Sequence, residues 1–225
     1  MRAFRFPTET VEFLTDLRAH NNKAWFDANR VRYESGYVEP AKAFVEAIGP
    51  DLDDLVPDIH AEPRVLGSIF RINRDIRFSS DKRPYKDHLD FWFWEGDRKA
   101  AVSGLFLRVS PDGVVVGAGA HGFDKRPLDA YRDAVADATA GSELATIVRD
   151  LAVAGHEIGG ETYKRVPRGY AVDGIRERLL RHSALYVHAQ LPAKTATSTR
   201  VVDTVLTHWR SFVSVHNWLV ANVEQ

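Results

Sequence analysis

Apolar residues in the N-terminal third recur at helical spacing. Val11, Leu14 and Leu17 fall on one face of a helix that should follow Thr8 as its N-cap. A run of His-Asn-Asn at residues 20–22 should end this helix. A second helix is expected from about residue 23 and a third around residues 44–48, with a break at Gly36 and Pro40.

The middle of the chain has the pattern of an antiparallel sheet. The candidate strands cover residues 65–78, 89–94, 102–109 and 114–119. The sequence Ser-Pro-Asp-Gly at 110–113 favours a turn, so the last two strands should form a hairpin. Residues 91–94, Phe-Trp-Phe-Trp, are apolar at every position, which is typical of a strand covered on both faces.

Helical spacing returns in the C-terminal third. Helices are expected over 127–137, 142–153 and 173–180, and from about residue 197 to near the end of the chain. Residues 155–170 are rich in glycine and predict a loop, and residues 184–189 predict one further strand.

These elements predict an α+β fold with a mainly antiparallel sheet, covered by N-terminal and C-terminal helices. No linker is visible, so residues 1–225 are expected to form a single domain. Its parts would be helical over 1–60, sheet over 61–122, and helical with one further strand over 123–225.

Composition narrows the chemistry of this 225-residue chain. With 30 Lys and Arg against 31 Asp and Glu, the net charge is −1, which disfavours a wholly basic nucleic-acid-binding protein. The absence of cysteine excludes disulfides, thiolate nucleophiles and cysteine-ligated metal centres. No cofactor is indicated, and no metal site is expected.

The expected compartment is the cytoplasm. The N-terminus lacks the apolar run of a signal peptide, and no stretch approaches the roughly 18 uncharged apolar residues of a membrane span. No membrane contact is therefore expected. Arginine greatly outnumbers lysine, which points to a GC-rich bacterial genome.

Positive charge is concentrated in residues 71–86. Six cations and two carboxylates give this segment a net charge of +4, so the rest of the chain carries −5 to reach the total of −1. The cations are Arg71, Arg74, Arg77, Lys82, Arg83 and Lys86, and the carboxylates are Asp75 and Asp81.

A strand over residues 70–78 would place Arg74 among apolar neighbours on one face. Arginine does not lose its proton, so Arg74 would need a fixed anion or several carbonyl partners. On the other face Asp75 would lie beside Arg77, close enough for an ion pair. After a turn, Lys82, Tyr85 and Lys86 are expected to project back over the arginine face.

The first functional hypothesis is a pocket for a phosphorylated or otherwise anionic small molecule. Guanidinium groups bind phosphate and carboxylate in a bidentate manner, lysine adds a point charge, and tyrosine adds a hydroxyl donor. Asp75 would orient an arginine, or act as an acid or base if the protein is an enzyme. No nucleophile or metal supports a named reaction. The expected ligand-binding residues are Arg71, Arg74, Asp75, Arg77, Asp81, Lys82, Tyr85 and Lys86.

Two alternatives stay open at this point. The segment could be an internal salt network, neutralised by its own aspartates and by distant carboxylates such as Asp27 or Glu34, with the function elsewhere. It could also belong to a non-catalytic nucleic-acid or protein-binding module, although nucleic acid is the less favoured partner. In that case a second basic cluster, Lys164, Arg165 and Arg168, would extend the surface. The sequence gives no oligomeric state.

The segment also resembles a known family. It fits the pattern R-x-x-R-D-x-R-F-x-x-D-K-x-P-Y-K of domain-of-unknown-function family 2461, a family of conserved hypothetical bacterial and fungal proteins. Residues 13–17, 21–26, 33–34, 110–111, 117–119 and 164–170 resemble other parts of the family pattern. The chain departs from it at 172–175, where Val-Asp-Gly-Ile replaces a usual Asp-His-Pro. The resemblance implies no activity, substrate or cofactor.

Weaker signals have simpler structural explanations. His88 with Asp87 and Asp90 is a poor match to metal-ligand spacing. The glycines of residues 117–122 resemble a dinucleotide fingerprint only in outline, and close strand packing explains them better.

Other isolated residues are also expected to be structural. Ser79 or Ser80 would need a nearby histidine to act as a nucleophile. His208 and His216 are expected to be partner-bonded or interfacial. The aromatic residues expected mainly in the core are Trp25, Phe26, Trp92 and Trp94.

Overall fold

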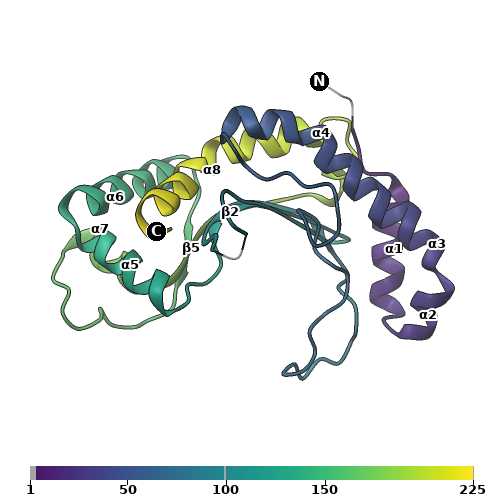
Figure 1. Ribbon diagram of the computed structural model, residues 1–225, viewed down its shortest axis with the longest axis horizontal. Coiled ribbons are helices and arrows are strands. Elements are labelled where there is room, and N and C mark those ends of the chain that lie inside the picture. Colours follow the sequence, from purple (N-terminus) through teal and green to yellow (C-terminus); the bar gives the residue numbers. More distant parts are fainter. Residues whose placement is uncertain (1–3, 99, 225) are drawn as a thin grey trace. The chain divides into compact units, whose positions relative to one another are not determined.

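The structure is a computed structural model that describes residues 4–98 and 100–224 (Figure 1). It confirms the α+β fold: a five-stranded antiparallel sheet with the order β1-β2-β3-β5-β4 is flanked by N-terminal and C-terminal helices. The strands are β1 (Leu89–Phe93), β2 (Gly104–Ser110), β3 (Gly113–Ala120), β4 (Ile158–Glu161) and β5 (His182–Leu191). No helix in the described ranges is long and apolar enough to cross a bilayer.

The helices fall into an N-terminal and a C-terminal group. The N-terminal group comprises α1 (Thr8–Ala19), α2 (Lys23–Ala28), α3 (Arg30–Tyr33), the π-helix η1 (Glu34–Val38) and α4 (Glu39–Leu55). The C-terminal group comprises α5 (Lys125–Ala136), α6 (Ala138–Val153), α7 (Gly174–Leu179), the 3-10 helix η2 (Ala193–Thr195) and α8 (Val201–Val223).

The chain divides into two compact units. The first contains residues up to 93, 106–116 and 190–207, and the second contains 94–105, 117–189 and the residues from 208 onward. The single domain expected over the whole chain stays a prediction.

An aromatic cluster forms the core of the first unit. The ring centroids of Phe6 and Phe44 lie 5.3 Å apart, and those of Phe44 and Phe91 lie 4.9 Å apart. All three side chains are buried. Full burial of each such ring contributes roughly 1.5–3 kcal/mol, so this cluster holds the N-terminal helices against β1.

The expected helix break at Gly36 and Pro40 was wrong. The chain passes from α3 through η1 directly into α4. Pro40 lies in the first turn of α4, directly after η1, so it is accommodated within this continuous helical segment. Gly36 lies against α1, because a Cβ atom there would come within 2.9 Å of Cγ of Glu9. The glycine therefore serves helix packing and not chain reversal.

The second unit packs α5, α6 and α7 together, as Figure 1 shows. The hydroxyl of Tyr131 donates a hydrogen bond to the carbonyl of Leu179 at 3.0 Å. The indole N–H of Trp218 on α8 donates to the carbonyl of Ala140 at 2.9 Å. These buried rings thus satisfy their polar atoms while linking separate helices.

The predicted strand over residues 65–78 was wrong, because this segment forms only isolated bridges. Residue Ile69 pairs with Phe91, and Asn73 pairs with Tyr85. Beyond residue 70 the dense positive charge favours solvent over coverage by a neighbouring strand. The other three middle strands and the turn at 110–113 are confirmed.

The expected loop over 155–170 contains the edge strand β4, so that prediction was partly wrong. β4 pairs antiparallel with β5 and its register shifts between Gly159 and Glu161. Gly160 has φ of +112°, a conformation that favours glycine. The glycines that indicated a loop in the sequence are therefore the residues that this bulge needs.

Glycine also sets the approach of β3 to β5. Gly119 has φ of +118°, and a Cβ atom at this position would collide with the carbonyl oxygen of Leu185. This agrees with the structural explanation of the glycines in 117–122.

Candidate functional site

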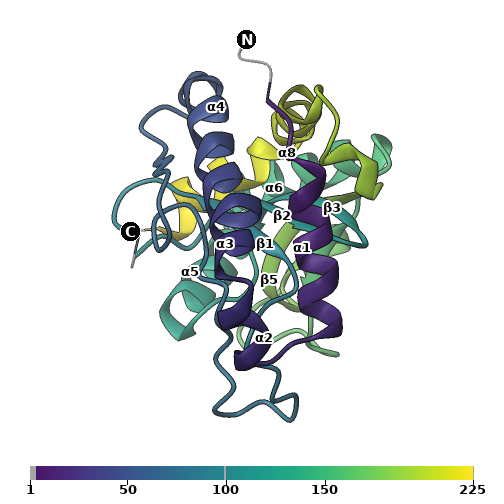
Figure 2. The same ribbon diagram turned by 90° about the vertical axis from the view of Figure 1, so that its right-hand side faces the viewer.

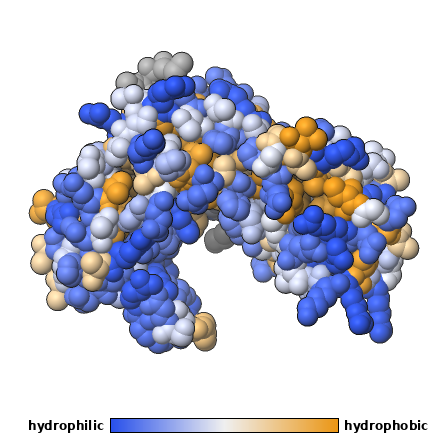
Figure 3. Space-filling model, turned by 180° about the vertical axis from the view of Figure 1, so that it is seen from behind, coloured by the Kyte–Doolittle hydropathy of each residue, from blue (hydrophilic) through white to orange (hydrophobic). Residues whose placement is uncertain are grey.

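The cationic segment forms an irregular loop between α4 and β1. Its base is closed by two backbone hydrogen bonds, from the N–H of Arg74 to the carbonyl of Pro84 at 2.9 Å and from the N–H of Lys86 to the carbonyl of Ile72 at 2.8 Å. The loop reaches beyond the neighbouring helices in Figures 1 and 2 and is a largely hydrophilic protrusion in Figure 3. Residues 71–86 are called the cationic loop below.

Tyr85 anchors the base of the cationic loop to the helices. Its ring is buried and stacks on Phe26 of α2, with centroids 4.2 Å apart and an interplanar angle of 18°. Its backbone N–H donates to Oδ1 of Asn21 at 3.0 Å, and Nδ2 of Asn21 donates back to its carbonyl at 3.0 Å. Tyr85 is therefore directed into the protein instead of projecting over the arginines.

The two carboxylates of the loop form ion pairs with three arginines. Asp75 pairs with Arg77 at 2.6 Å, as the sequence predicted. Asp81 pairs with Arg83 at 2.7 Å and with Arg74 at 2.8 Å. The guanidinium of Arg74 also donates to the carbonyl of Arg83 at 3.0 Å. Of the alternatives expected for Arg74, a fixed anion or several carbonyl partners, it has the anion.

These pairs lower the pKa of both carboxyls. Hydrogen bonds from the side chain and backbone N–H of Arg77 lower the pKa of Asp75. Hydrogen bonds from Arg83, and then from Arg74, lower the pKa of Asp81 well below its usual range. Both aspartates are thus anions at neutral pH, and their charge is already shared with cations of the loop.

Three cations remain outside these pairs, and two of them, Arg71 and Lys82, are exposed. Arg71 is exposed and has no hydrogen-bonded partner within residues 4–98 and 100–224. Lys82 is exposed and donates to the carbonyl of Ile76 at 3.1 Å. Arg77 is also exposed, with 76% of its side-chain surface accessible, and its guanidinium lies 5.8 Å from the ring centroid of Phe78. Phe78 is itself 96% exposed.

The last cation of the loop belongs to a separate polar network at the start of β1. Nζ of Lys86 lies 3.5 Å from Oδ2 of Asp90 and 4.7 Å from the ring centroid of Phe70. Oδ1 of Asp90 accepts from Nε of Arg108 at 2.7 Å. Nε2 of His88 lies 3.2 Å from Oδ2 of Asp90.

Burial alone would raise the pKa of Asp90, but the hydrogen bonds from His88 and Arg108 outweigh it and hold that pKa well below the usual range. The neighbouring Asp87 accepts from Nε of Arg18 at 2.7 Å. The network therefore fixes the root of the cationic loop on the sheet.

The histidine of this network lies between two carboxylates. Nδ1 of His88 faces Asp87 at 3.1 Å while its Nε2 faces Asp90, so both ring nitrogens are directed at carboxylates. In the part of the chain that the structure describes, no group of three or more His, Asp or Glu side chains is placed to hold a metal ion.

The remaining candidates have local partners. The hydroxyl of Ser79 accepts the backbone N–H of Asp81 at 3.2 Å and so supports the turn. Phe26 and Trp94 are buried, as expected for core residues. The exposed cluster of Lys164, Arg165 and Arg168 lies in the second unit, between β4 and α7, whereas the cationic loop lies in the first.

Sequence reasoning missed the residues that root the loop. Asn21 and Asn22 were interpreted together as a helix end. The first helix does end there, at Ala19 with His20 as its C-cap, whereas Asn22 begins the next helix, because its Oδ1 accepts the N–H of Trp25 at 3.0 Å and caps α2. Asn21 instead bonds the backbone of Tyr85, and no local pattern indicates a partner 64 positions away.

The fold and site define an α+β protein that carries an exposed, arginine-rich loop rooted by aromatic and amide contacts. The chain belongs to the family described as conserved hypothetical protein (DUF2461), which matches residues 9–218 and so covers nearly the whole chain. The resemblance found in the sequence is confirmed at the level of the family. Comparisons with curated proteins and with solved structures gave no match.

Proposed function

We propose that the chain binds the phosphate groups of an anionic ligand through the cationic loop. The observation that carries this proposal is the imbalance of charge within the loop. Its two carboxylates form ion pairs with Arg74, Arg77 and Arg83. In the described residues Arg71 and Lys82 form no ion pair, although the charge of Arg71 contributes to the lowered pKa of Asp75. An internal salt network needs no such surplus on its exposed side.

A phosphorylated small molecule is the first candidate ligand. Arg71, Arg77 and Lys82 offer exposed donors that suit the oxygens of a phosphate group. Because the three cations are exposed, their contacts with phosphate would be screened by salt, and we expect affinities in the micromolar range or weaker. We assign no reaction to this site.

Single-stranded nucleic acid is the second candidate, and Phe78 is the observation that favours it. A fully exposed aromatic ring beside an arginine matches the surfaces on which unpaired bases stack. A base stacked on such a ring contributes about 1–3 kcal/mol, and the cations would follow the backbone.

The test compares inorganic phosphate, ATP and an oligodeoxythymidylate by titration calorimetry. The Arg71→Ala/Lys82→Ala double variant should weaken binding of each probe that the wild type binds. Lys194→Ala, which removes an exposed lysine outside the loop, should not. For the oligonucleotide, loss of two phosphate contacts should reduce the slope of log K against log salt by about 1.4.

The ligand class follows from which probe binds. Binding of ATP with little gain for the oligonucleotide supports the small molecule. Binding of the oligonucleotide that weakens with Phe78→Ala supports nucleic acid. If wild type binds none of the probes at low salt, or if the double variant binds them unchanged, the proposal fails and the loop is a structural network.

We also propose a cytoplasmic location in a bacterial cell. The high proportion of arginine among the cations supports the bacterial source. Detection of the protein in the soluble fraction of a lysed host, with no membrane-bound pool, would support the location.

A further inference from the structure

A second constellation lies in the second unit, around the start of β2. The hydroxyl of Ser103 lies 2.9 Å from Nδ1 of His216 on α8. On the other side of the ring, Oε2 of Glu95 lies 2.8 Å from Nε2 of His216. Ser103 and His216 are both buried, with exposed fractions of 1% and 0%. A hydroxyl, an imidazole and a carboxylate thus stand in one row.

The imidazole is in the form that accepts a proton. Burial lowers the pKa of His216 to about 4, so the ring is neutral at pH 7. When Nδ1 accepts from Ser103, the ring proton resides on Nε2, on the side of Glu95. The oxygen of Glu95 lies off the N–H direction in this state. Such misalignment is common in resting sites and is corrected when substrate binds.

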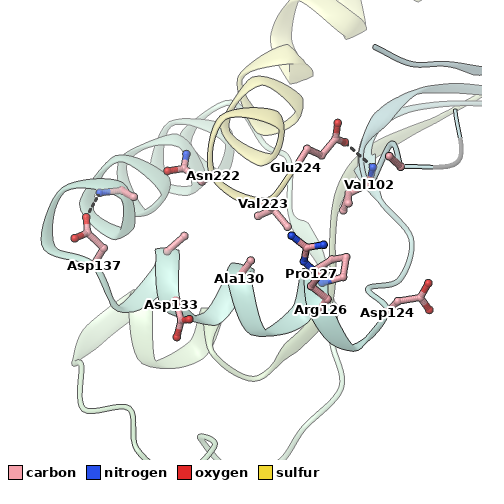
Figure 4. A pocket seen from close by; sticks show the side chains of 13 residues that line it. Val102, Asp124, Arg126, Pro127, Ala130, Asp133, Asp137, Asn222, Val223 and Glu224 are labelled. Carbon is pink, nitrogen blue, oxygen red and sulfur yellow. Dashed lines mark hydrogen bonds between the residues drawn. The ribbon is translucent and has the colours of Figure 1, made fainter. Parts of the chain in front are cut away.

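Two backbone N–H groups lie beside the row of Ser103, His216 and Glu95. The N–H groups of Val102 and Ser103 both donate to Oε1 of Glu224, each at 2.6 Å. Figure 4 shows the carboxylate of Glu224 turned toward Val102 at the wall of a pocket. The two donors converge on one anionic oxygen, which is the arrangement that stabilises the oxyanion in acyl transfer.

The pocket beside these donors has a volume of about 770 Å³. Its wall near Glu224 includes the apolar side chains of Val102, Pro127 and Val223, with Arg126 close by. A pocket of this size accommodates a small acyl donor beside Val102 and Glu224, and Ser103 is the next residue of the chain after Val102.

We propose that Ser103, His216 and Glu95 form a serine acyl-hydrolase site that Glu224 holds closed. The substrate class is a small carboxylic ester. Ser103 and His216 are the catalytic residues of this proposal, and Glu95 is a positioning residue that acts through His216. This activity is independent of phosphate binding by the cationic loop, with which the site shares no residue.

The reaction balances with water as the only co-reactant. Oγ of Ser103 bonds to the acyl carbon while its proton moves to Nδ1 of His216, and the carbonyl oxygen becomes an oxyanion held by the N–H groups of Val102 and Ser103. The C–O bond to the alcohol then breaks, and His216 gives its proton to the leaving oxygen. Water cleaves the acyl-serine by the same steps and releases the acid.

Glu224 must leave before an ester can enter. It is the residue directly after the end of α8, and its carboxylate fills the position of the oxyanion. Its removal should therefore activate the site, whereas removal of a merely structural glutamate should not.

The test uses a fluorophosphonate probe on the full chain, with the modified peptide identified by mass spectrometry. Glu224→Ala should be labelled at Ser103, and wild type should react at least about tenfold more slowly, as for a site open less than about a tenth of the time. Adding Ser103→Ala should abolish the adduct. Glu143→Ala, which removes an exposed glutamate on α6, should react like wild type.

The role of Glu95 has a separate readout in the pH profile of labelling. In the Glu224→Ala background, Glu95→Gln should move the midpoint of the profile to lower pH, because a carboxylate beside an imidazole favours its protonated form. Hydrolysis of p-nitrophenyl acetate by Glu224→Ala should follow the same profile.

The result that would overturn the proposal is a folded Glu224→Ala that is not labelled at Ser103. Labelling of another residue has the same meaning. If Glu224→Ala does not fold, Glu224→Asp replaces it, because the shorter side chain withdraws the carboxylate from the two donors. Absence of the Ser103 adduct in that variant also overturns the proposal.

Discussion

Replacement of Asp90 by asparagine tests whether the polar network stabilises the root of the cationic loop. The side chain of Asp90 is only 14% exposed and faces Lys86, His88 and Arg108. Asparagine keeps the volume but removes the charge, so Lys86 and Arg108 lose their common anion and His88 loses a charged hydrogen-bond partner. Breaking a buried ion pair costs about 3–5 kcal/mol.

The expected loss is smaller here because water reaches part of the network. Arg108 is 47% exposed and can be solvated after the change. We therefore expect Asp90→Asn to lower the free energy of unfolding by about 2–3 kcal/mol at pH 7. For a chain of this size that corresponds to a fall in Tm of about 4–12 °C. Urea unfolding followed by circular dichroism measures it, with the exposed Asp54→Asn as control.

The way this stability difference changes with pH tests the direction of the pKa shift of Asp90. The pKa of Asp90 in the folded chain lies below its unfolded value of about 3.9, so this carboxyl stabilises the fold above that value. The contribution is lost as the pH falls through the folded pKa. The difference between wild type and Asp90→Asn should thus be complete above about pH 5 and should shrink below about pH 4. A difference under about 0.5 kcal/mol at pH 7 would refute the reasoning.

Three further variants test local features by thermal and urea unfolding. Asp137→Ala removes the carboxylate that accepts hydrogen bonds from two N–H groups at the start of α6, each at 2.8 Å. It should lower the free energy of unfolding by about 1 kcal/mol, and an unchanged Tm would mean that water replaces this cap. Gly119→Ala adds a Cβ at φ of +118° against the carbonyl of Leu185 and should cost more than about 2 kcal/mol, so a stable variant would show that β3 can move from β5. Phe78→Ala should change stability by less than about 0.5 kcal/mol, since the ring is 96% exposed, and a larger loss would place that ring in the core.

The elements predicted from sequence were those specified by neighbouring residues. The strands near 89–94, 102–109 and 114–119 combine apolar runs with a turn at 110–113, and they form as expected. Residues 65–78 have similar apolar spacing, but a strand also needs a continuous partner, and this segment obtains only isolated bridges. Pairing is a property of the whole fold, so residue spacing alone predicted the wrong element.

In the candidate site too, the sequence predicted contacts between residues near each other in the chain and missed contacts between distant residues. The pair of Asp75 and Arg77 joins residues two apart, and the sequence indicated it directly. The contacts that root the loop join Tyr85 to Asn21 and Phe26, more than fifty positions away in the chain. Ser103 and His216 are 113 positions apart and have no sequence motif. Such contacts arise only when the N-terminal helices or α8 have packed.

The two proposed sites make independent demands on the chain. Ligand binding by the cationic loop depends on charge that the carboxylates of the loop do not neutralise. Loss of Arg71 and Lys82 should therefore weaken ligand binding and leave the fold intact. The site at Ser103 depends instead on buried polar groups that lie against one another, and Glu224 is the group whose removal exposes an unpaired pair of N–H donors. The first site would function through unneutralised charge on the surface. The second would function through buried N–H donors that Glu224 occupies in the resting protein. Failure of one proposal therefore leaves the other standing, because the variants that test them change no common residue.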